Sequence, residues 1–537
     1  MKKILTKVLA LSILVCSANQ PTNAQTPNIH WQKCLGGSGD DFAQNIIKLA
    51  DGNYLTCGFT NSTDGNFNAT HGDYDAFLVK TNAAGHIIWK KTYGGSSFDA
   101  LYNMLETSNG DIYAIGTTYS NDGQVSGKHG GAGDGDVWFT KVTSQGHLLS
   151  QHCYGGSGDE WAQGINRTSN NKIVFSGSTS SNDGDVSNNH GDYDGWVVEL
   201  NTNGTIKFSV TVGSAGYDEF TRVAEINGKL LVAGTTSSVP FSDPNMEDYA
   251  DANVAKLDHS GNIIYYRTYG GSGGDTGNAM VTTPDGNAVI TGHIASTDGD
   301  GTGNTGYNVW MWKIDVANNG NIIWNSFLGI PNFNSTGFNI MASHDGGFVV
   351  VGAAGHEISP PYDTFDGYVI KTDAYGNRLW NIQFGGSQTD SFNGVVEENN
   401  GSLFAVGYTA SDDGDIVGYH GGPGDALLVN IDGNGCHHNH RDANNSFGSD
   451  NFSLNSFPNP FSSSTTISFS LSQPEKVSVK IFDMAGRLVK ILANTEMQAG
   501  RHQLEWNTAN ENINAGIYFL KIETKEYAET KNVVIVK

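Results

Sequence analysis

A glycine-rich unit repeats seven times along this chain, and the repetition limits the possible folds more than any other feature. Two independent columns of residues keep the same rhythm. The first has steps of 56–61 residues and is aromatic at all but one position: Trp31, Trp89, Ser150, Phe208, Tyr265, Trp324 and Trp380. The second is invariant glycine: Gly58, Gly116, Gly177, Gly234, Gly292, Gly352 and Gly407. Self-similarity over such a period is typical of repeat folds, in which each unit buries its apolar faces against its neighbours.

Each unit contains four short strands. In the second unit we expect strands at 100–107, 112–117, 136–142 and 147–154. Asn109-Gly110 and Gln145-Gly146 provide the tight turns, and a long loop at 120–135 joins the second strand to the third. Four antiparallel strands per unit and seven units predict an all-β fold, a seven-bladed β-propeller over residues 25–435.

The two ends of this region complement each other. The segment Asn28-Ile29-His30-Trp31 copies the fourth-strand sequence Asn321-Ile322-Ile323-Trp324, but no first three strands precede it. The last unit stops after its third strand, at 425–431. We therefore expect the N-terminal strand to pair with this third strand and close the ring, which removes the exposed sheet edges.

The N-terminus reads as a signal peptide over residues 1–24. Lys2, Lys3 and Lys7 precede a short apolar run from Val8 to Val15, and Ala24 ends a small-residue cleavage site. The run is too short to span a bilayer, and we expect no transmembrane segment in the mature chain. At the other end of the propeller, residues 436–455 are polar and without periodicity, which is typical of a linker.

Residues 456–537 form a separate, strand-rich region. It begins with Phe457-Pro458-Asn459-Pro460, contains a turn at 483–487 and a strand from Gly516, and ends on Lys537. About seven short strands predict a small immunoglobulin-like β-sandwich. These ordered motifs closely resemble the type A C-terminal sorting domain of the type IX secretion system. The propeller units likewise resemble the glycine-rich propeller repeats of such secreted bacterial proteins.

The resemblance implies a route of export. It makes the type IX secretion machinery a partner through residues 456–537 and places the protein outside the cell, either secreted or on the outer-membrane surface. The net charge of −25 argues against nucleic acid as a partner, because phosphate binding needs clustered Lys and Arg. An extracellular glycan or a surface protein remains as a candidate ligand of the propeller.

Two segments match the sequence patterns of catalytic motifs but lack the structural context that those motifs need. Gly270–Gly274 fits a nucleophile elbow, and 301–306 fits a dinucleotide-binding fingerprint, but neither is followed by a helix. We therefore assign no catalytic and no cofactor-binding residue. A binding or adhesion protein is our main interpretation. The alternative is a secreted polysaccharide-degrading enzyme, a glycoside hydrolase or lyase, with a site where blades 4 and 6 depart from the repeat near 240–248 and 355–361.

The long loops between second and third strands carry a repeated acidic pattern. Five contain Ser-x-Asp-Gly, and several have a further Asp just before the third strand. Calcium prefers several oxygen ligands, so these loops are candidate Ca²⁺ sites. The candidate ligands are Asp64, Asp122, Asp183, Asp185, Asp298, Asp300, Asp413 and Asp415. The alternative is that these side chains cap their own turns through hydrogen bonds to the backbone.

Overall fold

The computed structural model describes residues 27–432, except 68–69, 243–245, 331–332 and 357–363, and residues 455–536, except a few short gaps (458–460, 462, 472–474, 485–486, 499, 509–512 and 526–527). The proposed signal peptide and most of the proposed linker lie outside the described residues. Contacts divide the chain into two compact units, 1–438 and 439–537. The described residues are almost entirely strands and turns, with two short 3₁₀ helices, η1 (Met246–Tyr249) and η2 (Gly299–Gly301).

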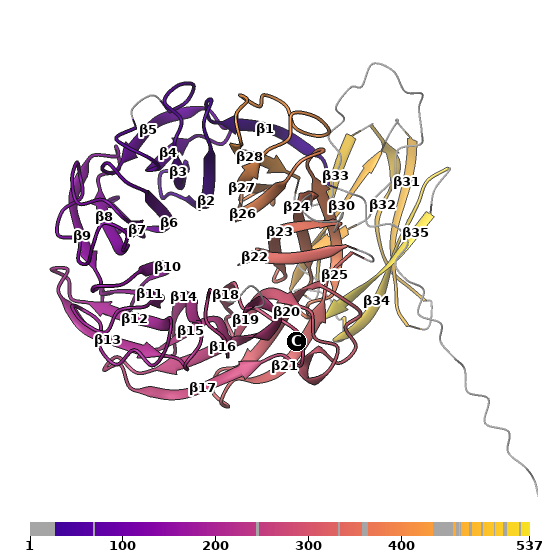
Figure 1. Cartoon of the computed structure of the whole chain (residues 1–537). Helices are drawn as coiled ribbons and strands as arrows, with labels where there is room; N and C mark the ends of the chain where they lie inside the picture. The colour runs from indigo at the N-terminus through magenta and orange to yellow at the C-terminus, as the bar shows by residue number, and fades with distance from the viewer. Residues whose placement is uncertain are drawn as a thin grey trace, which may run out of the picture. The chain divides into compact units, whose positions relative to one another are not determined.

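The first unit is a ring of seven four-stranded antiparallel sheets (Figure 1). Its first four blades follow the chain in order. Blade 1 contains β2 (Asp41–Lys48), β3 (Tyr54–Thr60), β4 (Asp75–Thr81) and β5 (Ile87–Tyr93). Blade 2 contains β6 (Asp99–Glu106), β7 (Ile112–Thr118), β8 (Asp136–Val142) and β9 (Leu148–Tyr154). Blade 3 contains β10 (Glu160–Arg167), β11 (Ile173–Thr179), β12 (Asp194–Leu200) and β13 (Ile206–Val212). Blade 4 contains β14 (Asp218–Ile226), β15 (Lys229–Ser237), β16 (Ala250–Leu257) and β17 (Ile263–Tyr269).

The remaining three blades complete the circle. Blade 5 contains β18 (Ala279–Thr282), β19 (Ala288–Ile294), β20 (Asn308–Asp315) and β21 (Asn321–Phe327). Blade 6 contains β22 (Asn334–Ala342), β23 (Phe348–His356), β24 (Thr364–Thr372) and β25 (Arg378–Phe384). Blade 7 contains β26 (Asp390–Glu397), β27 (Leu403–Thr409), β28 (Asp425–Ile431) and the N-terminal strand β1 (Ile29–Leu35).

The ring closes through the pairing of β1 with β28. The register runs from Ile29 opposite Ile431 to Leu35 opposite Ala426. The fourth strand of the last blade therefore comes from the start of the propeller, as the unpaired N-terminal repeat predicts. Closure leaves the sheet of blade 7 with the same four-stranded order as the other six sheets.

The core lies between adjacent blades. The third strands are apolar on both faces because each blade is covered on both sides, and β12 and β28 are buried along their whole length. The four third-strand tryptophans, Trp138, Trp196, Trp310 and Trp312, have no exposed surface. These tryptophans pack the propeller and are not available to a ligand.

The glycine column has a steric cause. In most blades the first strand carries a β-bulge, as between Ala43 and Asn45 of β2. Beside the bulge the first-strand backbone presses against the second strand. A Cβ on Gly58 would overlap the Phe42 carbonyl oxygen, and one on Gly177 would overlap that of Trp161. The repeat keeps glycine there because no side chain fits.

The second unit is a two-sheet β-sandwich. One sheet has the order β29 (Asn455–Phe457), β30 (Ser464–Leu471), β33 (Gly500–Asn507), and the other has the order β32 (Leu488–Met497), β31 (Glu475–Phe482), β34 (Gly516–Glu523), β35 (Ala528–Ile535). Its core contains Trp506, Ile467 and Leu520, all fully buried. The predicted small sandwich is confirmed.

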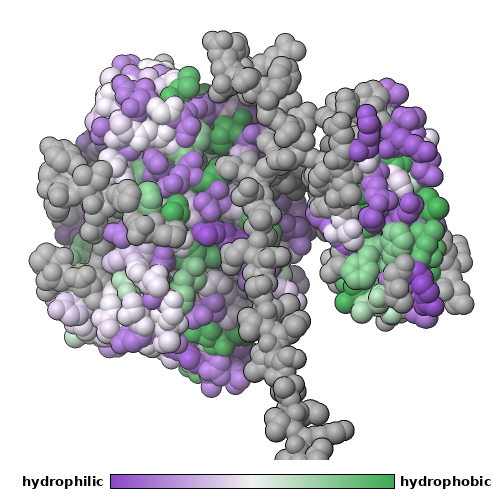
Figure 2. Space-filling view, turned by 90° about the vertical axis from the view of Figure 1, so that its right-hand side faces the viewer, coloured by the Kyte–Doolittle hydropathy of each residue, from purple (hydrophilic) through white to green (hydrophobic). Residues whose placement is uncertain are grey.

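Two surface properties complete the description. Within the described residues, we find no helix long and apolar enough to cross a membrane. On the face shown in Figure 2, hydrophilic and weakly polar residues cover most of the surface, with hydrophobic residues in groups between them.

Candidate ligand-binding site

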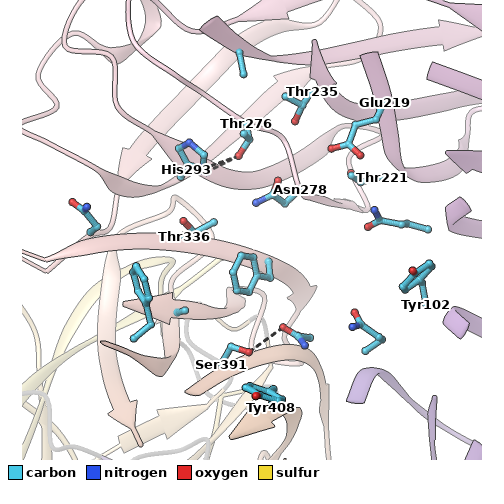
Figure 3. Close-up of a pocket in the computed structure, with 18 of the residues that line it drawn as sticks. Tyr102, Glu219, Thr221, Thr235, Thr276, Asn278, His293, Thr336, Ser391 and Tyr408 are labelled. Carbon is cyan, nitrogen blue, oxygen red and sulfur yellow. Dashed lines mark hydrogen bonds between the residues drawn. The ribbon is translucent and has the colours of Figure 1, made fainter. Parts of the chain in front are cut away.

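The first strands of the seven blades face the axis of the ring and enclose a cavity of about 1070 Å³, which we call the central cavity. All seven blades contribute to its wall, so no single repeat contains the site. Figure 3 shows hydroxyl, amide, carboxylate, imidazole and phenol groups pointing into the same space from different blades. The labelled residues are Tyr102, Glu219, Thr221, Thr235, Thr276, Asn278, His293, Thr336, Ser391 and Tyr408.

An almost continuous arc of aromatic rings lies along one edge of this cavity, at the end where the first strands begin. We call it the aromatic rim, and it extends over blades 7, 1, 2, 3 and 4. Its members are Tyr408, Phe42, Phe59, Tyr74, Phe98, Tyr119, Trp161, Tyr193, Tyr217 and Phe241. Several members, including Phe42, Tyr217, Phe241 and Tyr408, also line the central cavity.

The rings of the aromatic rim contact each other in sequence. Phe42 stacks on Tyr408 with centroids 4.3 Å apart and on Phe59 at 4.8 Å. The Trp161 indole Nε1 donates a hydrogen bond to the Tyr119 hydroxyl, 3.4 Å away. Phe241 packs 5.1 Å from Tyr217 and is 46% exposed. Most rings of the rim are therefore partly exposed and are held in place by contacts with one another.

Blade 4 places two charged side chains in the cavity. Along β14, Tyr217, Glu219, Thr221 and Arg222 descend from the rim toward the interior, and all four line the cavity. The Tyr217 hydroxyl donates to a Glu219 carboxylate oxygen at 2.9 Å. Burial raises the pKa of Glu219 despite this hydrogen bond, and burial lowers the pKa of Arg222 to about 10. Both shifts come from loss of water around a charge.

Blade 5 contributes a histidine that stays neutral. Burial lowers the pKa of His293 to about 4, so its imidazole carries no charge at neutral pH. Its Nδ1 lies 3.0 Å from the Thr276 hydroxyl (Figure 3). Its ring stacks on Tyr307 with centroids 5.0 Å apart. His293 therefore adds an aromatic face and neutral hydrogen-bonding capacity to the wall.

The structure places the eight candidate calcium ligands in five separate loops. The first aspartate of each loop accepts a hydrogen bond from a backbone N–H of the turn that leads into the first strand of the blade. The pairs are Ser38 to Asp64, Ser96 to Asp122, Ser157 to Asp183, Ser272 to Asp298 and Ser387 to Asp413, all at 2.7 Å. Asp185, Asp300 and Asp415 accept longer bonds, at 3.3–3.5 Å, from Gly155, Gly270 and Gly385.

These hydrogen bonds from backbone N–H groups to carboxylates have the geometry expected if the aspartates cap turns. Throughout the described ranges, no group of three or more His, Cys, Asp or Glu side chains gathers in an arrangement that could hold a metal. Each capping aspartate serves its own blade, and the loops stay apart around the ring. Calcium binding by these loops remains a prediction.

A second set of acidic residues lies beneath these loops and was not recognised as a set in the sequence. At six of the seven blade junctions, a first-strand and a third-strand carboxylate lie against the same glycine. The pairs are Asp41 and Asp425, Asp99 and Asp75, Glu160 and Asp136, Asp218 and Asp194, Asp275 and Asp251, and Asp390 and Asp366. Burial raises the pKa of Asp41 and Asp99 to about 6 and that of Glu160 to about 7.

The catalytic-motif matches and the departures from the repeat have structural roles where the structure describes them. Gly270–Gly274 is a turn between β17 and β18, and 301–306 is part of the loop between η2 and β20. The blade 4 insertion supplies Phe241 and Met246 to the cavity wall. In blade 6, 357–361 falls outside the described residues.

Comparison with known proteins identifies the family of the C-terminal unit. Residues 455–536 match the family described as secretion system C-terminal sorting domain. This unit is a type IX sorting domain. The sorting domain indicates that the protein is secreted or attached to the outer membrane.

The solved structures that are similar to this chain include several propellers. The WD40 domain of Neurospora crassa Pan2 has 10% sequence identity and a TM-score of 0.42, covering 75% of this chain and 95% of that chain. The quinohemoprotein alcohol dehydrogenase from Comamonas testosteroni has 12% identity and a TM-score of 0.40, covering 80% of both chains. The plexin A4 extracellular region has 8% identity and a TM-score of 0.44, covering 94% of this chain and 67% of that chain. The comparison with curated proteins gave no match.

The aromatic rim is not predicted from the sequence. A signal was present, because an aromatic residue stands directly before the Asp or Asn that precedes the apolar run of the third strand in blades 1, 3, 5 and 6, at Tyr74, Tyr193, Tyr307 and Phe365. Tyr74 and Tyr193 belong to the aromatic rim, whereas Tyr307 and Phe365 line the central cavity outside it, and only the closed ring reveals this arrangement.

Proposed function

We propose that this protein binds an extracellular glycan outside the cell, with the sugar chain at the aromatic rim and its end in the central cavity. The single observation that carries the proposal is the aromatic rim itself, because most of its rings are partly exposed beside a cavity lined by hydroxyl and amide groups. The sorting domain would bring the chain to the secretion machinery and so deliver the propeller to that location.

The chemistry of the wall supports a polyhydroxylated ligand. A pyranose ring has an apolar face that packs on an aromatic ring and hydroxyl groups around its edge that need hydrogen-bond partners. The rim supplies flat apolar surface. Thr276, Asn278, Thr336 and Ser391 supply donors and acceptors from blades 5, 6 and 7 (Figure 3). The wall therefore combines apolar ring surface with many hydroxyl and amide groups, which suits a ligand that has both kinds of surface.

Glycoside hydrolysis is the second candidate, and Glu219 is the observation that favours it. Its raised pKa suits a general acid, which must stay protonated near neutral pH. A second carboxylate must face the same bond. Among the described wall residues the other carboxylate is Asp390, whose Oδ2 already accepts hydrogen bonds from the Gly386 N–H at 2.8 Å and the Ser411 hydroxyl at 2.9 Å. These bonds support a structural role for Asp390, so we rank binding first.

A glycan array on the purified chain, scored for both retention and product release, tests the proposal. We expect retention without release, and product release would instead support the hydrolase. For a retained glycan, Phe241→Ala should weaken binding by about tenfold, because a central aromatic contact contributes roughly 1–2 kcal/mol. Tyr375→Ala is the matched control, since Tyr375 is 75% exposed in a turn between the third and fourth strands, at the opposite end of its blade from the rim. Equal affinities of the two variants, or no retained glycan at all, would remove the proposal.

A further inference from the structure

Below the rim, three blades share a layer of asparagines at the position after the first-strand bulge, and each donates a hydrogen bond toward the next blade. The bonds run from Asn45 to the Asn103 side chain, from Asn103 to the Gln163 carbonyl and from Asn339 to the Asn393 carbonyl, at 2.8–3.0 Å. In blade 5 the equivalent position is Ala279, and Asn278 before it donates to the Gly337 carbonyl at 3.0 Å. These bonds tie neighbouring first strands together around the axis.

Blade 4 breaks this layer with an arginine. Arg222 occupies the position that pairs with Ala233 after the bulge of β14, as Asn45 pairs with Cys57 after the bulge of β2. The equivalent position in blade 3 is Gly164, which has no side chain, and the Arg222 backbone lies against it. The Arg222 side chain is the member of this layer that lines the central cavity.

The Arg222 guanidinium is poorly paired. Its side-chain hydrogen bond within the described residues is from Nη1 to the carbonyl of its own neighbour, Thr221, at 2.9 Å. No carboxylate of the described part of the chain lies within ion-pair distance of it. A guanidinium has five N–H donors in a planar fork, so most of its capacity is unused in a site where water is limited.

The other titratable groups that line the cavity do not neutralise this charge. Glu219 lies on the same strand nearer the rim and is held by Tyr217. His293 is neutral, and the Asp390 carboxylate is engaged with Gly386 and Ser411. The cause of the lowered pKa of Arg222 is desolvation, with only the Cys57 thiol acting in the opposite direction. A desolvated cation without a counter-charge in the cavity wall is costly for the free protein and gains most from an anionic ligand group.

We propose that Arg222 binds an anionic group, a carboxylate or a sulfate, at the inserted end of the glycan. The inference rests on the proposed function and narrows its ligand to acidic saccharides. The guanidinium fork accommodates two oxygens of either anion side by side. The net charge of −25 repels anions in general. Selection for the acidic group therefore depends on the local site and not on long-range attraction.

The test compares ligands that differ only in charge, with the full chain. Short oligogalacturonates are measured against their neutral methyl esters, and a sulfated oligogalactan against its desulfated form. We expect at least tenfold tighter binding of the acidic member of one pair. The pair that shows the preference identifies the anion as carboxylate or sulfate.

Variants then assign the preference to the arginine. Arg222→Gln should reduce the affinity for the acidic ligand to that for its neutral partner and leave the neutral affinity unchanged. Arg222→Lys should recover only part of the preference, because an ammonium lacks the fork. Arg267→Gln is the control, since it removes the same charge from a partly exposed site on the fourth strand, outside the cavity, where Arg267 contacts Asn321.

The outcomes separate the two proposals. If neutral and acidic ligands bind equally, or if Arg222→Gln weakens both equally at an unchanged melting temperature, this inference is wrong while glycan binding stands. If no saccharide of either kind binds and the array also retains none, the proposed function is wrong. If Arg222→Gln does not fold, the wild-type comparison and the Arg222→Lys variant still decide the question.

Discussion

Asp41 and Asp425 lie against the same glycine, Gly36, at the junction where the ring closes, and a Cβ on Gly36 would overlap a carboxylate oxygen of each. Asp41 is fully buried and accepts hydrogen bonds from the Thr60 and Ser62 hydroxyls and the Gly37 N–H. Asp425 is equally buried; one of its oxygens accepts from the His420 N–H, and the other has no hydrogen-bond partner. Two like charges in this space favour retention of a proton.

The first prediction is a fall in stability as the pH rises. Burial raises the folded-state pKa of Asp41 to about 6 from an ordinary 3.8, so the folded state holds its proton more tightly than the unfolded chain. The retained proton contributes to the free energy of unfolding, and this contribution is fully present below about pH 4. It is lost as the pH rises through about 6 for Asp41, or about 7 for Glu160. The Asp41 difference corresponds to roughly 3 kcal/mol. We expect a higher melting temperature near pH 5 than near pH 8.

Blade 5 supplies the matched variant for this prediction. Its third strand begins with Asn308, which lies against Gly329 where the other junctions have an acid. Asp425→Asn should therefore be tolerated and should flatten the dependence on pH. A melting temperature that stays constant or rises from about pH 5 to pH 8 in the wild-type chain would contradict the raised pKa values of these buried acids.

The second prediction concerns the closing strand. A chain without residues 25–35 lacks β1 and leaves β28 as an unpaired apolar edge. Because exposed edges pair with other chains, we expect aggregation and loss of most of the thermal stability. Size-exclusion chromatography and a melt check this. The control removes residues 25 and 26 only. A monomer with an unchanged melting temperature would show that β1 is dispensable.

The third prediction concerns residues from about 456 onward. A chain that ends at Asn455 keeps every described strand of the propeller and loses β30–β35. We expect it to fold and to bind ligand as before, but to remain in the periplasm, because the sorting domain is absent. Cell fractionation measures the distribution. Normal amounts of the truncated chain at the surface would mean that export does not need this unit.

The fourth prediction separates calcium binding from turn capping in the acidic loops. At roughly 1 mM calcium, a site with a Kd of about 0.1 mM adds about 1.4 kcal/mol of stability. If the loops bind calcium, the melting midpoint in millimolar calcium exceeds that in EDTA, and Asp183→Ala with Asp185→Ala reduces the difference.

Capping gives a different result. The Asp183 carboxylate accepts from the Ser157 N–H in any buffer. Under capping alone, the double variant melts lower by the same amount in calcium and in EDTA, and the wild-type midpoints in the two buffers coincide. A typical capping hydrogen bond to a charged group contributes about 1.5–3 kcal/mol, so the effect is measurable.

The sequence predicts the scaffold well for a physical reason. Gly58 and its six counterparts are required wherever the first strand presses on the second, so the spacing of glycines reports the spacing of blades directly. The apolar third strands report burial on both faces. Both signals are local, and each blade repeats them.

The candidate site is not predicted from the repeat in this way, because its chemistry depends on differences among blades. Phe42, Glu219, Thr336 and Ser391 occupy equivalent places, each paired next to the conserved glycine of its blade. In the sequence alone, these differences between equivalent positions look like degeneration of the repeated pattern. Only the closed ring shows that they face one cavity and that Arg222 lacks a counter-charge there.

The pairing of Ile29 with Ile431 also sets the order of assembly. The strand β1 is synthesised first, and its partner β28 follows only after about four hundred further residues. A contact between positions so distant in the chain carries a large entropic cost of loop closure and forms slowly. Until then the propeller has two open edges facing each other. The period between translocation and closure is therefore the time at which this protein is most exposed to misassembly and proteolysis, and a chaperone that held the first strand would act there.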